Sequence, residues 1–295
     1  MSKNVSRLIK AFEGFKEGLK PYSDPPKGMF GAVAIIESGG VTLKSEELDI
    51  EFTVNLDDNV ESDEAEIIVY NLSKTTIQAL KRENPISITA GYKGDTGVIF
   101  DGKIHNVATK KEGIDKKTTI KALAYIGGSN KTLANKTYRA GTKASYILKD
   151  LITNYITLPL AVFKVRRDHT YKDEVKIDGE VWEEIKKFAE VCGISAYVNN
   201  GKIYARHISE GDNINFTVSA DKGLIGSPEE FEEEITAEDY KDTVKGYKLK
   251  MLLQHRMTTA AIIDLESLDV SGTFRVRSGT HTFNNSETIT EVEVV

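Results

Sequence analysis

The chain has 295 residues and a formal net charge of −6, with 40% hydrophobic and 28% charged residues. This composition is typical of soluble globular proteins and argues against wholesale disorder, a fibrous class or a dedicated nucleic-acid-binding protein. No apolar run reaches the roughly 18 residues of a membrane-spanning helix, so no stable membrane insertion is expected. The single cysteine, Cys192, excludes an internal disulfide and a zinc cluster built on thiolates.

The N-terminal residues 1–31 are predicted to form an arm. A short amphipathic helix with Leu8, Phe12, Phe15 and Leu19 on one face precedes a Pro/Gly-rich stretch that cannot continue it. The basic residues at the start lack the continuous apolar stretch of a secretory signal. We therefore expect synthesis in the cytoplasm.

Residues 32–126 are predicted to form a small β-barrel that carries one helix. Alternation of apolar and polar residues, as in 51–56, is typical of half-buried strands. Ser73 is placed to cap a short helix, which Pro85 forbids to continue.

Residues 127–210 change to a helical period and are predicted to form an α+β domain. Thr142 is the expected N-cap of a first helix, and a second helix is expected from near Asp178. Gly193 stands where a left-handed C-cap is expected, and Asn200-Gly201 between alternating segments predicts a β-hairpin.

Residues 211–295 return to strands and are predicted to form a second β-barrel, which makes the fold class α+β and mainly β. Expected strands include 244–253, 260–265 and 272–276. The acidic run 229–234 is interpreted as a solvated turn or helix face that serves solubility.

Motifs that carry chemistry are not found in the sequence. The five histidines lie too far apart along the chain to form a local metal pair. Phosphate-binding loops and nucleophile elbows are missing, and Cys192 falls on the apolar stripe of its predicted helix. The many carboxylates show no sequence sign of one buried and one solvated partner. We expect no enzyme, and no catalytic, cofactor-binding or metal-binding residue.

Within residues 50–107 four motifs follow one another: a strand that ends in Y-N-L-S (70–73), a helix, a second strand that ends in A-G-Y (90–92), and an I-F-x-G-x-I strand (99–104). This order of motifs resembles the N-terminal barrel of phage tail hub proteins. Residues 193–204 are similar to the helix-to-hairpin segment of the same proteins. Residues 224–228 and 246–253 are similar to their second barrel.

The resemblance departs from the family pattern at one place. Hub proteins often continue with proline and glycine after the Leu252-Leu253 pair, whereas this chain has Gln-His-Arg-Met at 254–257. The likeness covers about three quarters of the chain.

The resemblance to baseplate hubs of contractile phage tails and tail-like particles, the late control protein D-like family, implies a fold and a role. The fold would be two tail-tube-like β-barrels with an inserted α+β domain. A homotrimer would then present six barrels, joining the six-fold tail tube to the three-fold central spike. Implied partners are the tube protein, the spike, other baseplate proteins and the tape measure protein, with DNA passing through an acidic lumen. The implied location is the virion or tail-like particle.

Subunit contacts are expected where apolar side chains would otherwise be exposed. Phe12 and Phe15 in the arm are the candidate interface residues. The alternatives that remain open are a tail-associated cell-wall hydrolase, a tube-end or distal-tail protein, and a hub of another injection system such as a secretion-system spike. A trimer favours the hub and a hexamer favours a tube or distal-tail protein.

Overall fold

A computed structural model describes residues 31–58, 63–124, 133–199, 202–237 and 240–295. The arm residues Phe12 and Phe15, the 127–128 joint and the Asn200-Gly201 turn lie outside the described residues. Among the residues described, no helix is long and apolar enough to cross a membrane.

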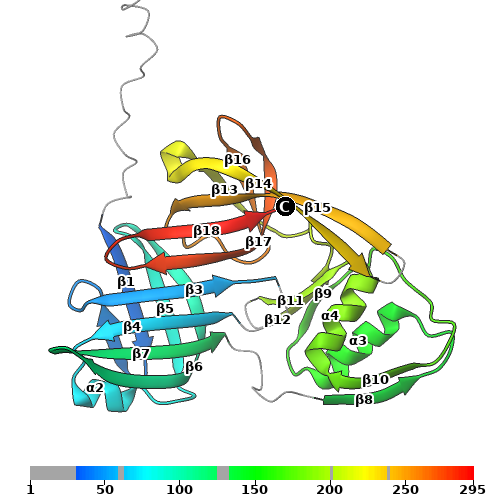
Figure 1. Ribbon diagram of the computed structural model, residues 1–295, viewed down its shortest axis with the longest axis horizontal. Coiled ribbons are helices and arrows are strands. Elements are labelled where there is room, and N and C mark those ends of the chain that lie inside the picture. Colours follow the sequence, from blue (N-terminus) through cyan, green and yellow to red (C-terminus); the bar gives the residue numbers. More distant parts are fainter. Residues whose placement is uncertain (1–30, 59–62, 125–132, 200–201, 238–239) are drawn as a thin grey trace, which may run out of the picture.

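The first β unit combines seven strands with one short helix (Figure 1). Its elements are β1 (Ala32–Ser38), β2 (Val41–Lys44), β3 (Ile50–Leu56), β4 (Glu64–Tyr70), α2 (Lys74–Ala79), β5 (Pro85–Tyr92), β6 (Asp95–Glu112) and β7 (Asp115–Ala124). Apolar residues of β3 point inward and alternate with polar residues that point outward, as a strand of period two requires. Ser73 caps α2 as predicted, since its hydroxyl accepts a hydrogen bond from the Thr76 amide at 3.0 Å.

The middle unit packs two helices against two small sheets. Its elements are β8 (Leu133–Tyr138), α3 (Ala144–Tyr155), β9 (Leu160–Phe163), β10 (Val175–Glu180), α4 (Val181–Val191), β11 (Ser195–Asn199) and β12 (Lys202–Arg206). The Gly193 prediction is confirmed: at φ +67° its amide donates to Glu190 and the Ile194 amide donates to Ala189, which together close α4. The predicted antiparallel pair on either side of 200–201 is confirmed by the register Asn199 to Lys202.

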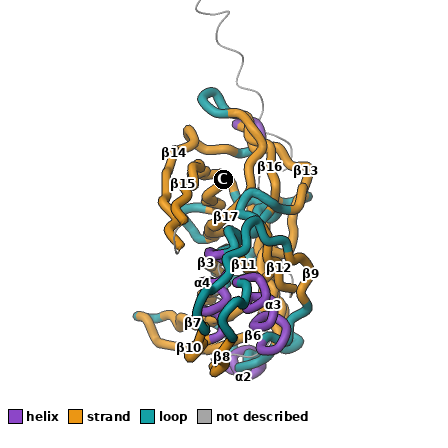
Figure 2. Tube along the Cα trace, turned by 90° about the vertical axis from the view of Figure 1, so that its right-hand side faces the viewer, coloured by secondary structure: helices purple, strands orange, loops and turns teal. Residues whose placement is uncertain are grey.

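The second β unit contains six strands and one 3₁₀ turn and lies above the other two units (Figures 1 and 2). Its elements are β13 (Asp212–Ser219), η1 (Ala220–Lys222), β14 (Leu224–Ala237), β15 (Tyr240–Leu252), β16 (Ala261–Glu266), β17 (Ser271–Phe283) and β18 (Thr288–Val294).

The two β units share one sheet of thirteen strands. Its main path runs β14-β15-β18-β17-β3-β4-β7-β6-β5-β1-β2, and β13 joins through β16 to β17. The predicted fold class, mainly β with an α+β insert, is therefore confirmed. Backbone pairing among the described residues leaves the sheet open, with β14 and β2 at its two ends.

Three separate hydrophobic cores fill the three units. The first lies within residues 34–124 and includes Leu253 and Phe283 of the second unit, the next lies within 134–205, and the last lies within 218–294. The boundaries 32–126, 127–210 and 211–295 stay a prediction, because a core does not define where a domain ends. The contribution of Phe283 to the first core indicates that the two β units are not independent bodies.

Two local predictions are wrong. The acidic run 229–234 forms strand β14 rather than a turn or helix face, because its register with β15 fixes it in the sheet. Thr142 does not cap α3; its hydroxyl donates to the Arg139 carbonyl, while Asp168 accepts from the Ser145 amide at 3.0 Å. Two strand pairs of the described residues, β13 with β16 and β12 with β9, are parallel.

Candidate functional site

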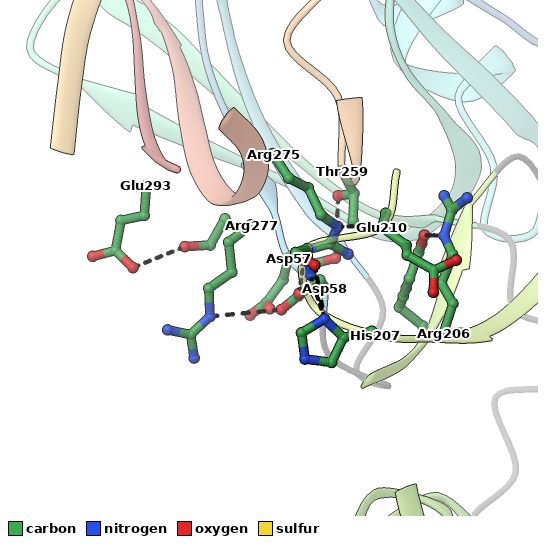
Figure 3. A network of polar contacts seen from close by, with 12 residues as sticks. Asp57, Asp58, Arg206, His207, Glu210, Thr259, Arg275, Arg277 and Glu293 are labelled. Atoms are coloured by element: carbon green, nitrogen blue, oxygen red, sulfur yellow. Dashed lines mark hydrogen bonds and ion pairs between the residues drawn. The ribbon is translucent and has the colours of Figure 1, made fainter. Parts of the chain in front are cut away.

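The joint where the three units meet concentrates most of the buried charge of the described chain, and we take it as the candidate site (Figure 3). Strand β17 makes the joint continuous. Its first half, Ser271–Arg275, pairs with β16, and its second half, Gly279–Phe283, pairs with β3 of the first unit. A Cβ at Gly279 would lie 2.4 Å from the Glu291 carbonyl oxygen, so only glycine allows β17 to approach β18 this closely.

Arg275 is the side chain at the centre of the joint and is 1% exposed. Its Nη1 donates to Asp58 Oδ2 at 2.8 Å, and its Nε donates to the Glu210 carbonyl at 2.9 Å. The guanidinium also lies 5.3 Å from the centroid of the Tyr197 ring. Asp58 follows β3, Tyr197 lies on β11, and Glu210 precedes β13. One cation therefore holds together all three units.

A second buried arginine, Arg206, braces the middle unit beside Arg275. Its Nε donates to the Tyr197 hydroxyl at 2.7 Å, and its two terminal nitrogens donate to the carboxylate of Asp212 at 3.2 and 2.8 Å. The guanidinium lies 5.0 Å from the centroid of Tyr204, which is itself stacked on Tyr197. Bidentate pairing of this kind fixes direction as well as distance.

Further polar contacts extend the joint to its rim. Arg277 approaches Asp58 Oδ1 at 3.9 Å and donates to Glu233 on β14, which holds the pKa of the Glu233 carboxyl below its usual value. Thr259 donates from its hydroxyl to the Asp57 carbonyl at 3.1 Å. The strand that carries the acidic run is thereby tied to the centre of the molecule.

Residues 254–257, where the sequence differs from the hub-protein pattern, form a clip between the two β units. Arg256 donates from both terminal nitrogens to the carboxylate of Asp95, at 2.7 Å each, and Asp95 begins β6 of the first unit. This hydrogen bonding lowers the pKa of Asp95. His255 fills the space over Gly97, where an added Cβ would meet its ring at 2.1 Å.

His281, on β17, anchors the same clip. It is fully buried, and its Nε2 donates to the Met257 carbonyl at 3.0 Å. The Thr290 hydroxyl accepts from the Gln254 amide at 2.9 Å, so it donates its proton to His281 Nδ1 at 2.8 Å. These three bonds define one neutral tautomer. Burial lowers the pKa of His281 to about 4, which keeps the ring neutral.

A hollow of about 520 Å³ lies beside the joint and is lined by all three units, including Phe100, Val198 and Thr259. Asp63 faces it, and burial raises the pKa of this carboxyl to about 7. Asp63 accepts a hydrogen bond from the Asp57 backbone amide at 3.0 Å, which ties the residue before β4 to the end of β3.

The contacts of this joint hold the three units in place relative to one another. Its arginines are engaged by carboxylates, carbonyls and rings of the same chain. Burial raises the pKa of the Cys192 thiol to about 12, so the thiolate that a nucleophile needs does not form near neutral pH. Among the described residues no group of three or more His, Cys, Asp or Glu is placed to hold a metal ion.

This joint was not predicted from the sequence. Arg275 and Arg277 alternate with apolar residues in β17, and this alternation alone does not reveal that Arg275 points into the molecule. The one available signal was the Gln-His-Arg-Met departure at 254–257. These four residues form the clip.

Searches by sequence match no family model and no curated protein. Comparison of the fold matches solved structures instead. A tail protein from Neisseria meningitidis MC58 aligns with a TM-score of 0.60 at 10% identity, covering 90% of this chain and 96% of that one. The 43 kDa tail protein of prophage MuSo2 from Shewanella oneidensis aligns with a TM-score of 0.57 at 8% identity, covering 90% and 97%.

A third match is the Escherichia coli c3393 protein, which is described as a component of the type VI secretion system. It aligns with a TM-score of 0.58 at 8% identity, covering 88% of this chain and 76% of that one. The class of protein is thus defined by fold: the chain has the fold of phage tail proteins and of related type VI secretion proteins. The predicted resemblance to tail hubs is confirmed at this level.

Proposed function

We propose that this protein is a structural subunit of a phage tail or tail-like particle, and that it forms the central hub of its baseplate. The observation that carries the proposal is the placement of two β units in one chain, fused through β17 and braced by the middle unit. The tail proteins of Neisseria and Shewanella match this architecture along almost their whole length.

Symmetry supports this role. A homotrimer of a chain with two β units offers six such units, which suits a six-fold tube on one side and a three-fold spike on the other. The two units must then keep a fixed spacing under load. A continuous strand, the buried Arg275 pair and the Arg256 clip supply that rigidity. Partners on this proposal are the tube protein, the spike, other baseplate proteins and the tape measure protein, in the virion or particle.

The role is non-enzymatic on this proposal. The alternatives are a cell-wall hydrolase and a tube-end or distal-tail protein. Light-scattering mass, measured alone and with tube and spike proteins, together with a cell-wall hydrolysis assay, separates the three. A trimer without hydrolysis supports the hub, a hexamer points to a tube or distal-tail protein, and turnover points to a hydrolase. A strongly positive lumen in the assembled ring would contradict passive passage of DNA.

The same proposal divides the chain into four segments, 1–31, 32–126, 127–210 and 211–295. The first of them is the arm. Phe12 and Phe15 would contact a neighbouring subunit. Deleting residues 1–20 should then weaken assembly while the melting temperature of the monomer stays unchanged. Unaltered assembly of the shortened chain would refute this role for the arm.

A further inference from the structure

The hairpin formed by β6 and β7 ends in a cluster of lysines, which we call the lysine tip (residues 110–117). It contains four lysines and two carboxylates. In the register of the hairpin, Lys110 stands opposite Lys117 and Lys111 stands opposite Lys116. Like charges directly across a strand pair destabilise it. The isolated chain therefore maintains two unfavourable pairs at the end of a projecting hairpin.

The turn of the lysine tip also exposes an apolar side chain. Ile114 is 95% exposed at the apex of the hairpin. Glu112 and Asp115 are the only carboxylates within the tip. The carboxylate of Glu112 lies 4.0 Å from the ammonium group of Lys117 in an exposed pair. Exposed pairs of this kind contribute little. Fold stability thus does not explain why lysines and an isoleucine gather here.

The opposite charge gathers on β14. Residues 229–234, the glutamate strand, contain five glutamates, all exposed, around Phe231. Two of the five are engaged inside the chain, Glu232 with Lys245 at 3.2 Å and Glu233 with Arg277. Among the described residues Glu230 and Glu234 form no ion pair, and strand alternation puts these two on one face.

The glutamate strand is also a free edge of the sheet. In the thirteen-stranded sheet β14 pairs only with β15 and ends the path, whereas edge strands are places where other chains add or dock. Natural edges are commonly protected with charge, most often lysine. Five glutamates protect this edge against copies of itself and make it attractive to a cationic surface.

The lysine tip and the glutamate strand face away from each other. In Figure 1 the turn between β6 and β7 lies at the left-hand end of the molecule, and the β14–β15 hairpin extends to the right over α4. The two surfaces of one copy therefore cannot meet. Complementary surfaces at opposite ends of one chain produce head-to-tail contacts, which generate a ring when the rotation closes.

We propose that the lysine tip of one copy docks on the glutamate strand of the next copy, head to tail around the ring. This inference rests on the proposed function, because it names the contact that builds the homo-oligomer. The partner is a second copy of this chain, selected by charge complementarity. Such contacts govern the association rate and its dependence on salt.

Charge reversal tests the contact directly. Lys110→Glu with Lys111→Glu reverses the tip, and Glu230→Lys with Glu234→Lys reverses the strand. Each pair alone should raise the dissociation constant of the oligomer by about tenfold or more, and the four changes together in one chain should restore it. Mass photometry at about 50 and 500 mM NaCl gives the readout, and wild-type assembly should weaken at the higher salt.

Two controls separate this contact from folding and from net charge. Reversing the tip places glutamates opposite Lys117 and Lys116, so the melting temperature of the monomer should hold or rise while assembly falls. Lys172→Glu with Lys202→Glu makes the same change in net charge on exposed residues of the middle unit and should leave assembly intact.

The outcomes distinguish this inference from the proposed function. Restoration by the four-fold reversal supports the docking. Full-strength rings from every variant would overturn the docking and leave the hub proposal standing. Loss in both pairs without restoration would overturn it as well, since the two surfaces would then not face each other. A wild-type chain that stays monomeric with tube and spike proteins would overturn both.

Discussion

Protonation of His281 is expected to loosen the clip between the two β units. The ring is fully buried, and its Nδ1 accepts the proton of the Thr290 hydroxyl while its Nε2 donates to the Met257 carbonyl. A proton added at Nδ1 would face a hydroxyl already oriented as a donor, in an environment without a carboxylate contact. Burial is the main cause of the lowered pKa of His281, and the neighbouring His255 also disfavours a positive charge on the ring.

The magnitude follows from the two pKa values of His281. Its pKa is about 4 in the folded chain and 6.5 in the unfolded chain. Between these values the unfolded state binds more protons, so stability is fully present above pH 6.5 and is lost as pH falls toward 4. A difference of about 2.5 units corresponds to about 3 kcal/mol.

The assay compares wild type with His281→Gln, whose side-chain amide can still donate to the Met257 carbonyl. Urea unfolding at several pH values between 7.5 and 4 gives the free energy of unfolding for each chain. Carboxylates titrate equally in both, so the advantage of wild type should shrink by about 3 kcal/mol across this range. Parallel curves for the two chains would refute the reasoning.

Three further predictions concern neighbouring groups. Asp58→Asn should lower the free energy of unfolding by about 3 to 5 kcal/mol, because it leaves the buried Arg275 cation without its carboxylate. Adding Arg275→Met should recover most of this loss. A double variant as unstable as Asp58→Asn alone would contradict the assignment of the loss to an unpaired Arg275. Arg256→Met, which breaks a half-exposed pair with Asp95, should cost about 1 kcal/mol at low salt and less in about 1 M NaCl, and a salt-independent cost would count against an ionic clip. Asp63 has a folded pKa of about 7 against 3.8 unfolded, so stability falls as pH rises between these values. The free energy of unfolding of Asp63→Asn, taken relative to wild type, should therefore rise by about 1 to 2 kcal/mol as the pH increases from 4 to 7.5. A difference between the two chains that stays constant over this range would contradict the raised pKa.

Features set by neighbouring residues were readable from the sequence. Ser73 caps its helix because the acceptor and donor are three residues apart, and Gly193 closes α4 because only glycine readily adopts a positive φ there. Alternation in β3 likewise reports which side faces the core. In each case the deciding contact lies within a few residues, so a short window contains the whole cause.

Features set by distant residues were not readable. The cap of α3 is supplied by Asp168, more than twenty positions after the helix begins, rather than by Thr142. Residues 229–234 carry five glutamates and lack the apolar alternation of a strand, yet register with β15 makes them one. The pairing of β17 with β3 joins positions more than two hundred residues apart. No local propensity encodes such a choice of partner.

The polar character of the joint argues for orientation rather than for stability as its purpose. An apolar surface of the same size would hold the two β units together, but hydrophobic contact is non-directional and tolerates sliding. Arg275 with Asp58 permits only one relative placement, since a shift would leave buried charge unpaired. The half-exposed pair of Arg256 with Asp95 adds a second directional contact. Removal of both partners of the Arg275 pair should consequently preserve folding while broadening the relative orientation of the units. Double electron–electron resonance between labels on β2 and β15 would report that broadening, and an unchanged distance distribution would show that the shared strand β17 alone sets the geometry.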